Sequence, residues 1–402
     1  MTFLSDPISY IGDWLENLLI GLGLAPNIAE LVVITIGALV LATVALLSVL
    51  LLIWFERKAV ARMQDRIGPN RLGPYGIFQS IADVIKLITK EYITPVGVDK
   101  VTYNLAPLLA VMAVIGIWAV IPFSVTVYGS DLNVGVLYIV AVGAIGVLAI
   151  IMAGWSSNNK YALLGAFRAV SQLVSYEVPL VTALLIPVML TGSMSITSIV
   201  EAQNVWYILI APLGFVIFLT ASIAEVGRAP FDLLEADSEI VAGFNIEYSS
   251  MKFGMFFVAE FLHAFTIGAV GATLFLGGWR GPGSETYPIL GTFYFLLKAF
   301  LVYFVVVWAR GTFPRVRIDQ LLNFSWKFLT PLALVLLIVV AVFYKIVEGS
   351  SAWVFVPSMF AVNILIALGT IQILRKIGRR KRMRVSEDRP VATAPESDFQ
   401  QI

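Results

Sequence analysis

The stretch 224-AEVGRAPFDLLEADSEIVAGFNIEYSSMK-252 lies between two strongly apolar segments and is itself rich in acidic residues. It holds six carboxylates, which are Glu225, Asp232, Glu235, Asp237, Glu239 and Glu247. Arg228 is its only basic residue before Lys252. A connector between membrane helices needs only a few polar residues to remain in water. The large number of carboxylates and the rigid Arg-Ala-Pro-Phe-Asp turn therefore predict that this loop binds another protein and passes charge toward the membrane interior.

The composition of the whole chain is that of a membrane protein. Hydrophobic residues make up 59% of its 402 residues and charged residues only 13%. Soluble globular domains are typically about 45–50% apolar and about 25% charged. A soluble core could not bury so many apolar side chains, so lipid is the expected solvent for most of the chain. The predicted fold class is an all-α polytopic membrane protein.

Cysteine is absent from the chain, and histidine occurs once, at His263. Iron–sulfur clusters need several thiolates, and haem or zinc sites normally take two or more Cys or His ligands. We therefore expect no metal site and no redox centre in this chain, so any redox centres would belong to partner chains. Taken alone, His263 is more typical of a satisfied interior residue than of a functional one.

Nine stretches are long and apolar enough to cross a bilayer as helices. They are residues 28–54, 103–124, 134–155, 161–190, 204–224, 253–278, 289–309, 328–347 and 353–374. Residues 8–24 instead place apolar side chains at helical spacing between polar ones, which predicts an amphipathic helix on the membrane surface. The expected organisation is an outer-face segment (1–27), an eight-helix core (28–347), an additional ninth helix (348–374) and a basic, disordered tail (375–402).

Basic residues gather on one side of this nine-span arrangement. Of the 27 Lys and Arg residues, all but Arg280, Lys298 and Lys345 fall in or beside four alternate connectors or in the C-terminal tail. These connectors are residues 55–102, 156–160, 225–252 and 310–327. Because basic residues favour the cytoplasmic side, the positive-inside bias predicts an outside N-terminus and a cytoplasmic C-terminus.

The first of these connectors is long and carries the signals of local structure. Gly-Pro pairs at Gly68-Pro69 and Gly73-Pro74 indicate turns. After Pro74, apolar residues at helical spacing form one face, while Asp83, Lys86 and Lys90 fall elsewhere. A helix opening at Pro74 and lying in the membrane interface is therefore expected.

Several ionisable residues fall inside the predicted spans, where charge is costly and such residues are often functional. Glu177, Glu260 and Lys298 lie within spans, His263 lies one turn after Glu260, and Glu225 marks the start of the acidic loop. A series of carboxylates that ends at an acidic loop is typical of a hydrated proton path. The alternative is a set of buried ion pairs that hold helices together, and for Lys298 the two interpretations are evenly balanced.

Five stretches carry a resemblance to a known family. They are WFERKAVARMQDRIGPNRLGPYGIFQSIADVIKLITKE (54–91), SSNNKYALLGAFRAVSQLVSYEVPL (156–180), the acidic loop from residue 224, LFLGGW (274–279) and RGTFPRVRIDQLLNFSWK (310–327). In this order they resemble the family that includes the H subunit of bacterial NADH:quinone oxidoreductase, respiratory complex I, and mitochondrial subunit 1. The stretches cover most of residues 30–347.

The resemblance implies a subunit that joins the membrane arm of complex I to its peripheral arm and forms much of the quinone chamber. It implies coupling of quinone reduction to proton translocation, with menaquinone or ubiquinone as the substrate. NADH, FMN and the iron–sulfur clusters would be bound by partner subunits. Other membrane-arm subunits, the quinone-module subunits of the peripheral arm and membrane lipids would be the partners, in a bacterial inner membrane with the functional loops on the cytoplasmic side.

The family pattern also assigns roles to individual residues. Residues expected to line or support the quinone chamber are Arg57, Asp83, Glu91, Arg228, Asp232, Arg315 and Arg317. Residues expected to carry protons or couple charge are Glu177, Glu225, Glu235, Asp237, Glu239 and Glu260, with Lys298 as a further candidate. The chain departs from the pattern at Val226, Gly227 and His263, where Thr, Asn and a neutral polar residue are commoner.

Two other functions compete with this one. A related membrane subunit of an energy-converting hydrogenase-type complex would keep the fold and act without quinone, but the Arg-rich first connector favours the quinone enzyme. A free-standing ion transporter is the other alternative. It would be expected to have short connectors and internal repeats, and the sequence has neither of these features.

Overall fold

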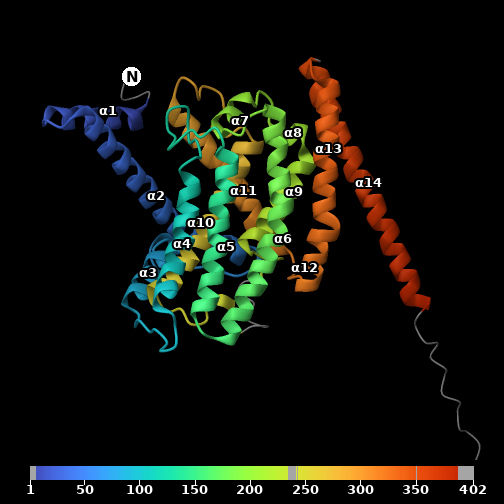
Figure 1. The fold of residues 1–402 in the computed structure, drawn as a ribbon, viewed down its shortest axis with the longest axis horizontal. Helices are drawn as coiled ribbons and strands as arrows, with labels where there is room; N and C mark the ends of the chain where they lie inside the picture. Colours follow the sequence, from blue (N-terminus) through green and yellow to red (C-terminus); the bar gives the residue numbers. More distant parts are fainter. Residues whose placement is uncertain (1–5, 234–240, 242, 350, 388–402) are drawn as a thin grey trace, which may run out of the picture.

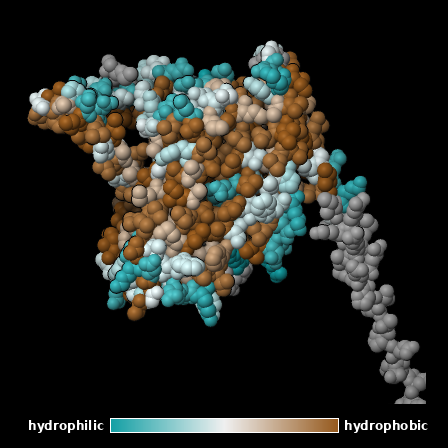
Figure 2. All heavy atoms as spheres, viewed as in Figure 1, coloured by the Kyte–Doolittle hydropathy of each residue, from teal (hydrophilic) through white to brown (hydrophobic). Residues whose placement is uncertain are grey.

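A computed structural model describes residues 6–233, 241, 243–349 and 351–387 of the chain. The described residues form helices joined by loops and contain no strand. Most of the helices run side by side between the two ends of the molecule (Figure 1). On the face seen in Figure 2, a broad hydrophobic band lies between two hydrophilic ends, as expected for a protein that spans a bilayer. The all-α polytopic membrane fold is confirmed.

The first helix, α1 (Pro7–Gly21), lies level with one end of the bundle, projects to its side and makes an angle with α2 (Pro26–Met63) (Figure 1). None of its residues is buried, and the Asp6 carboxylate caps it by accepting a hydrogen bond from the Ser9 amide at 3.3 Å. Such a helix agrees with the predicted surface segment. The α2 helix has 38 residues and so reaches well beyond a hydrocarbon layer about 30 Å thick.

Eight helical segments are long and apolar enough to cross a membrane. They are α2, α4 (Lys100–Trp118), α5 (Gly135–Ser156), α6 (Lys160–Thr191), α10 (Ser250–Phe275), α11 (Pro288–Thr312), the Ile318–Val347 segment and the Trp353–Lys376 part of α14 (Ala352–Glu387). The Ile318–Val347 segment joins α12 (Ile318–Phe324), a π-helical turn η3 (Ser325–Leu329) and α13 (Thr330–Val347).

The fifth of the nine predicted spans, residues 204–224, is broken into two helices. It contains α8 (Tyr207–Ile210) and α9 (Pro212–Val226), and α7 (Ile196–Ala202) precedes it. The break falls at Ala211, whose φ of −132° and ψ of 63° are not helical. A proline ring disfavours helical geometry in the residue before it, so Pro212 accounts for the break.

The interfacial helix of the first connector begins later than the sequence predicts. Pro74–Gly76 is a short 3-10 turn, η1, and the helix α3 runs from Gln79 to Thr89. Tyr75 and Gly76 both have positive φ, of 55° and 75°, which interrupts a helix at this point. Only glycine fits at residue 76, because a Cβ there would lie 2.3 Å from the Pro69 carbonyl oxygen.

The buried centre of the bundle is α10, which packs against α4, α11, α2 and α9. Gly268 allows α10 to approach α11 closely, since a Cβ there would lie 2.6 Å from the Ala299 carbonyl oxygen. A second 3-10 turn, η2 (Gly243–Asn245), packs beside α5 and α6 just before α10 begins. At the other end of the chain, α14 continues through the basic run as far as Glu387, so residues 375–387 of the expected disordered tail are helical.

Candidate functional site

A buried ion network joins three elements near one end of the bundle, with Glu56 of α2 at its centre. The Glu56 side chain is buried, with 3% of the residue exposed. One of its carboxylate oxygens pairs with both Arg228 and Arg310, and the other accepts a hydrogen bond from the Tyr303 hydroxyl at 3.1 Å. Two guanidinium groups and a hydroxyl therefore compensate this buried charge, which an apolar site would otherwise destabilise strongly.

Arg228 extends the network to a second carboxylate. Its Nε lies 3.0 Å from Glu260 Oε1 of α10, and its guanidinium lies 4.3 Å from the centre of the Phe261 ring. Only 3% of Arg228 is exposed. A planar guanidinium can bind two carboxylates at fixed angles, which an ammonium group does less well. Arg228 thus links Glu56 and Glu260 in one buried, charge-compensated unit.

The turn that carries Arg228 is held by the backbone of its neighbours. Gly227 ends α9 with a left-handed φ of 73°, and the amides of Gly227 and Arg228 donate to carbonyls of the last helical turn. Asparagine also tolerates this conformation, so glycine in place of the commoner Asn preserves the turn. Gln172 of α6 donates to the Ala224 and Phe231 carbonyls at 2.6 and 2.7 Å, which fixes the turn against the bundle.

An open hollow, here called the basic cleft, lies beside this network. Its volume is about 340 Å³, and its lining residues come from α2, the Arg228 turn, α10 and α11: Glu56, Arg57, Val60, Gln64, Arg66, Ala229, Phe257, Phe261 and Arg310. Arg57 also pairs with Asp83 of α3 at 2.5 Å, and Lys86 lies 3.8 Å from the same carboxylate. The cleft combines aromatic walls with three guanidinium groups, an arrangement suited to a flat ligand with polar oxygens.

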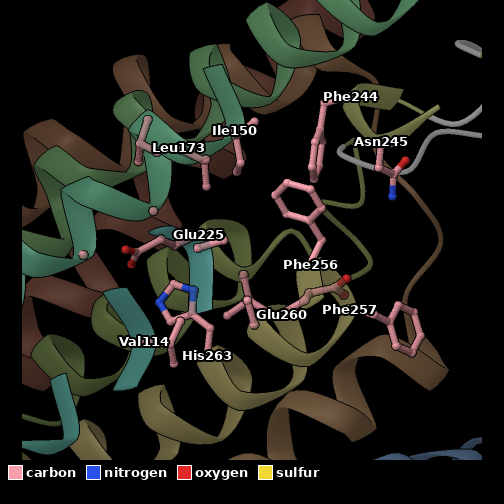
Figure 3. Close-up of a pocket in the computed structure, with 16 residues that line it drawn as sticks. Val114, Ile150, Leu173, Glu225, Phe244, Asn245, Phe256, Phe257, Glu260 and His263 are labelled. Carbon is pink, nitrogen blue, oxygen red and sulfur yellow. The ribbon is translucent and has the colours of Figure 1, made fainter. Parts of the chain in front are cut away.

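Two adjoining cavities lie deeper in the bundle, on the other side of Glu260. The first cavity, of about 100 Å³, is lined by Glu225, Glu260, His263 and otherwise mainly apolar residues of α4, α5, α6, η2 and α10 (Figure 3). The second cavity, of about 40 Å³, is lined by Glu177, Glu225, His263 and apolar residues. The structure thus brings three of the predicted coupling carboxylates to two adjacent cavities, although they come from three different helices.

The remaining predicted residues occupy different surroundings. Asp232 and Arg315 are half-buried, whereas Glu91 and Arg317 are exposed, and none of the four is among the residues that line the basic cleft. Glu235, Asp237 and Glu239 lie outside the described residues. The residue that the sequence reasoning missed is Glu56. It is an acid at the end of a long apolar run, followed at once by Arg57 and Lys58, so the sequence places it with the charged residues of the connector.

Lys298 lies apart from the carboxylates. Its ammonium group donates to the carbonyls of Gly278 and Arg280 at 2.9 and 2.7 Å and lies 5.3 Å from the centre of the Trp206 ring. It lines neither of the two cavities. These contacts tie α11 to the turn that follows α10, and they favour a structural role over a role in proton transfer.

We expect Lys298→Met to lower the thermal stability of the assembled protein and to leave proton movement unchanged. The substitution removes two hydrogen bonds from a charged donor, each of which contributes about 1.5–3 kcal/mol. Thermal inactivation and proton-to-electron ratio should be measured on the same preparation. A reduced ratio at unchanged thermal stability would contradict the structural role.

The last part of the acidic stretch is anchored to the bundle. The Glu247 carboxylate accepts a hydrogen bond from Asn159 at 2.6 Å, and its carbonyl accepts one from the Tyr103 hydroxyl at 2.7 Å. Tyr248 stacks on Tyr103 with ring centres 4.2 Å apart. Burial raises the pKa of Tyr248 to about 12, so its hydroxyl stays protonated and donates to the Tyr103 carbonyl. This end of the loop is therefore positioned by α4 and by the residue that caps α6.

Comparison with known proteins gives consistent similarities over most of the chain. A family model described as NADH dehydrogenase matches residues 36–341. A protein of Dehalococcoides mccartyi (strain CBDB1), named as the H subunit of NADH-quinone oxidoreductase, is 48% identical over 341 residues, which are 85% of this chain and 94% of that protein. The protein of the same name from Brevibacillus brevis is 46% identical over 324 residues, 80% of this chain and 96% of that protein. The protein of the same name from Cupriavidus pinatubonensis is 44% identical over 327 residues, which are 78% of this chain and 92% of that protein.

Proposed function

The chain belongs to the NADH dehydrogenase family, and from this premise we propose that its basic cleft binds the quinone that NADH-quinone oxidoreductase reduces. The chain is a membrane subunit of that complex. The two cavities between Glu260 and Glu177 then form the route by which the reduction is coupled to proton translocation. The relatives described above are named as subunits of the NADH-quinone enzyme, which does not favour the hydrogenase-type or transporter alternatives.

The observation that carries the proposal is the position of Arg228 between two carboxylates. Glu56 lines the basic cleft, Glu260 lines the first cavity, and Arg228 pairs with both of them. A change of charge in the cleft can therefore reach the cavity through one buried guanidinium. Arg228 connects Glu56 of the basic cleft to Glu260 of the first cavity, and no further residues are needed between them.

The chemistry of quinone reduction supplies such a change of charge. Conversion of a quinone to a quinol takes up two electrons and two protons, and electrons that arrive before protons place negative charge on the quinone oxygens. That charge attracts the guanidinium groups of Arg57, Arg66 and Arg310, which line the cleft, and that of Arg228, which lies behind Glu56. A guanidinium drawn toward the cleft holds Glu260 less tightly, so the proton affinity of Glu260 rises and it takes up a proton.

The electrons come from partner subunits in this proposal. The chain has no cysteine and a single histidine, so its own residues offer few ligands for a redox metal. Partner subunits of the peripheral arm that carry the iron–sulfur clusters would cover the cleft, and the acidic loop would contact them. Because the cleft lies on the side where basic residues concentrate, it would face the cytoplasm of a bacterium, with the chain in the inner membrane. The isoprenoid tail of menaquinone or ubiquinone would extend along α2 and α10 into lipid.

We expect Asp83→Asn to raise the KM for quinone several-fold and to change kcat little. The substitution weakens the ion pair that holds Arg57 and joins α3 to α2 beside the cleft. A partly exposed ion pair of this kind contributes about 1 kcal/mol or less to holding Arg57 in place. This corresponds to a change in quinone binding of at most roughly five-fold. The measurement is quinone-dependent NADH oxidation by the intact complex with a short-chain quinone.

Asp13→Asn is the matched control for this experiment. Asp13 is an exposed carboxylate on α1, and the same loss of charge there should leave the KM unchanged. If Asp83→Asn and Asp13→Asn give the wild-type KM alike, the Arg57–Asp83 pair has no part in quinone binding.

A further inference from the structure

The two cavities share three of their lining residues. Among the described residues, Gly143, Glu225 and His263 line both cavities, whereas Glu260 lines only the first and Glu177 only the second. Figure 3 shows the Glu225 carboxylate and the His263 ring facing one another at one end of the first cavity, with Glu260 farther along α10. Glu225 and His263 therefore form the junction between the two cavities.

His263 faces titratable groups from three helices. Glu225 comes from α9, Glu260 lies one turn earlier on α10, and Glu177 comes from α6 across the second cavity. The residues that α4 and α5 place around the cavities are uncharged: Ala110, Val114, Ile117, Ile139, Val140, Gly143, Gly146, Val147 and Ile150. The imidazole is half-buried, and within the described part of the chain no protein atom forms a hydrogen bond with it. Its surroundings, as far as the structure describes them, thus contain three acids and no hydrogen-bond partner.

The shape of the junction leaves room for groups to move. Gly143 has no side chain there, and a Cβ at this position would lie 4.0 Å from Glu225 Oε1. The first cavity, at about 100 Å³, is large enough for several water molecules, each of which needs about 10–15 Å³ by the same measure. Figure 3 shows the His263 ring and the Glu260 carboxylate apart from one another. Water in this cavity can bridge them.

We propose that His263 carries protons between Glu260 and Glu225, and so joins the two cavities into one proton route; this inference rests on the function proposed above. An imidazole suits the task because one nitrogen can accept a proton while the other releases one. A water-bridged proton from the Glu260 carboxylic acid protonates the free nitrogen of the neutral ring and leaves a carboxylate. The imidazolium gives its other N–H proton to the Glu225 carboxylate, and the ring returns to the neutral form as the opposite tautomer. Rotation of the ring restores the starting arrangement.

The experiment uses the intact complex reconstituted into liposomes, with proton uptake and NADH oxidation recorded together. His263→Asn keeps a polar side chain that does not titrate, and His263→Ala opens a space for added imidazole. Both variants are expected to lower the rate of proton movement about 10-fold or more, because proton transfer by a positioned group typically contributes at least that much. Imidazole added to His263→Ala should restore proton movement, and it should not restore that of Glu225→Gln.

Each result separates the role of His263 from the function proposed for the whole subunit. Wild-type proton movement in both His263 variants, with a loss in Glu225→Gln, would overturn the His263 assignment and leave the proposed function intact. A loss in His263→Ala that imidazole does not change would also overturn it, since the residue would then act through structure. Normal proton movement in Glu225→Gln as well would remove the cavities from the coupling route altogether.

Discussion

Replacing Arg228 with methionine is expected to prevent assembly of most of the complex and to lower its NADH:quinone activity at least about 10-fold. The substitution removes the cation that lies between Glu56 and Glu260, and it leaves a buried network with an excess of negative charge. Breaking a buried ion pair in this way typically costs about 3–5 kcal/mol, a large share of the stability of a protein. Assembled complex on native gels and activity per assembled complex are the two measurements.

A double variant separates assembly from coupling. Arg228→Met combined with Glu260→Gln removes one positive and one negative charge, so the balance of the network is restored and more complex should assemble. The link between cleft and cavity is still absent, so quinone-coupled proton movement should remain low. Arg228→Lys is the matched control for charge, since an ammonium group keeps the charge but binds two carboxylates at fixed angles less well. Wild-type coupling in the double variant would show that Arg228 transmits nothing.

Glu177→Gln and Glu260→Gln are expected to lower the proton-to-electron ratio more than they lower assembly of the complex. Glutamine keeps the size and hydrogen-bonding capacity of glutamate and removes the titrating group. Both carboxylates line the cavities, and Glu260 lies at the end that joins Arg228. The loss should be greatest for Glu260, because its substitution also changes the partner of Arg228.

Glu201→Gln provides the matched control for these two variants. Glu201 is an exposed residue of α7, and neither cavity includes it. Its substitution should leave proton movement and NADH oxidation unchanged. A wild-type proton-to-electron ratio in both Glu177→Gln and Glu260→Gln would remove the carboxylate series from the proton route.

The sequence alone predicts the helical membrane fold because hydrophobic length is a local property of the chain. It fails where a single residue overrides the pattern. Pro212 breaks the fifth predicted span into α8 and α9, although the apolar run is continuous. Positive φ at Tyr75 and Gly76 delays the start of α3. The conformation at Gly76 depends on the close approach of the Pro69 carbonyl, which the spacing of apolar residues does not indicate.

The candidate site is only partly visible in the sequence because it depends on contacts between distant residues. The carboxylates in or beside spans are conspicuous, so the sequence alone makes Glu177, Glu225 and Glu260 candidates. Glu56 lies inside α2, where the apolar run meets the basic residues of the connector, and its role depends on Arg228, which is 172 positions away. For Lys298 the sequence leaves two interpretations evenly balanced, and only its carbonyl partners favour a structural role.

The measurement that tests the central claim most directly is photolabelling of intact membranes with an azido-quinone, followed by mapping of the labelled peptides. The account predicts label on the part of α2 that contains Arg57 and Val60 and on the part of α10 that contains Phe257 and Phe261, with an excess of native quinone protecting both. Label confined to partner chains would contradict it, because the basic cleft would then not be where the quinone binds.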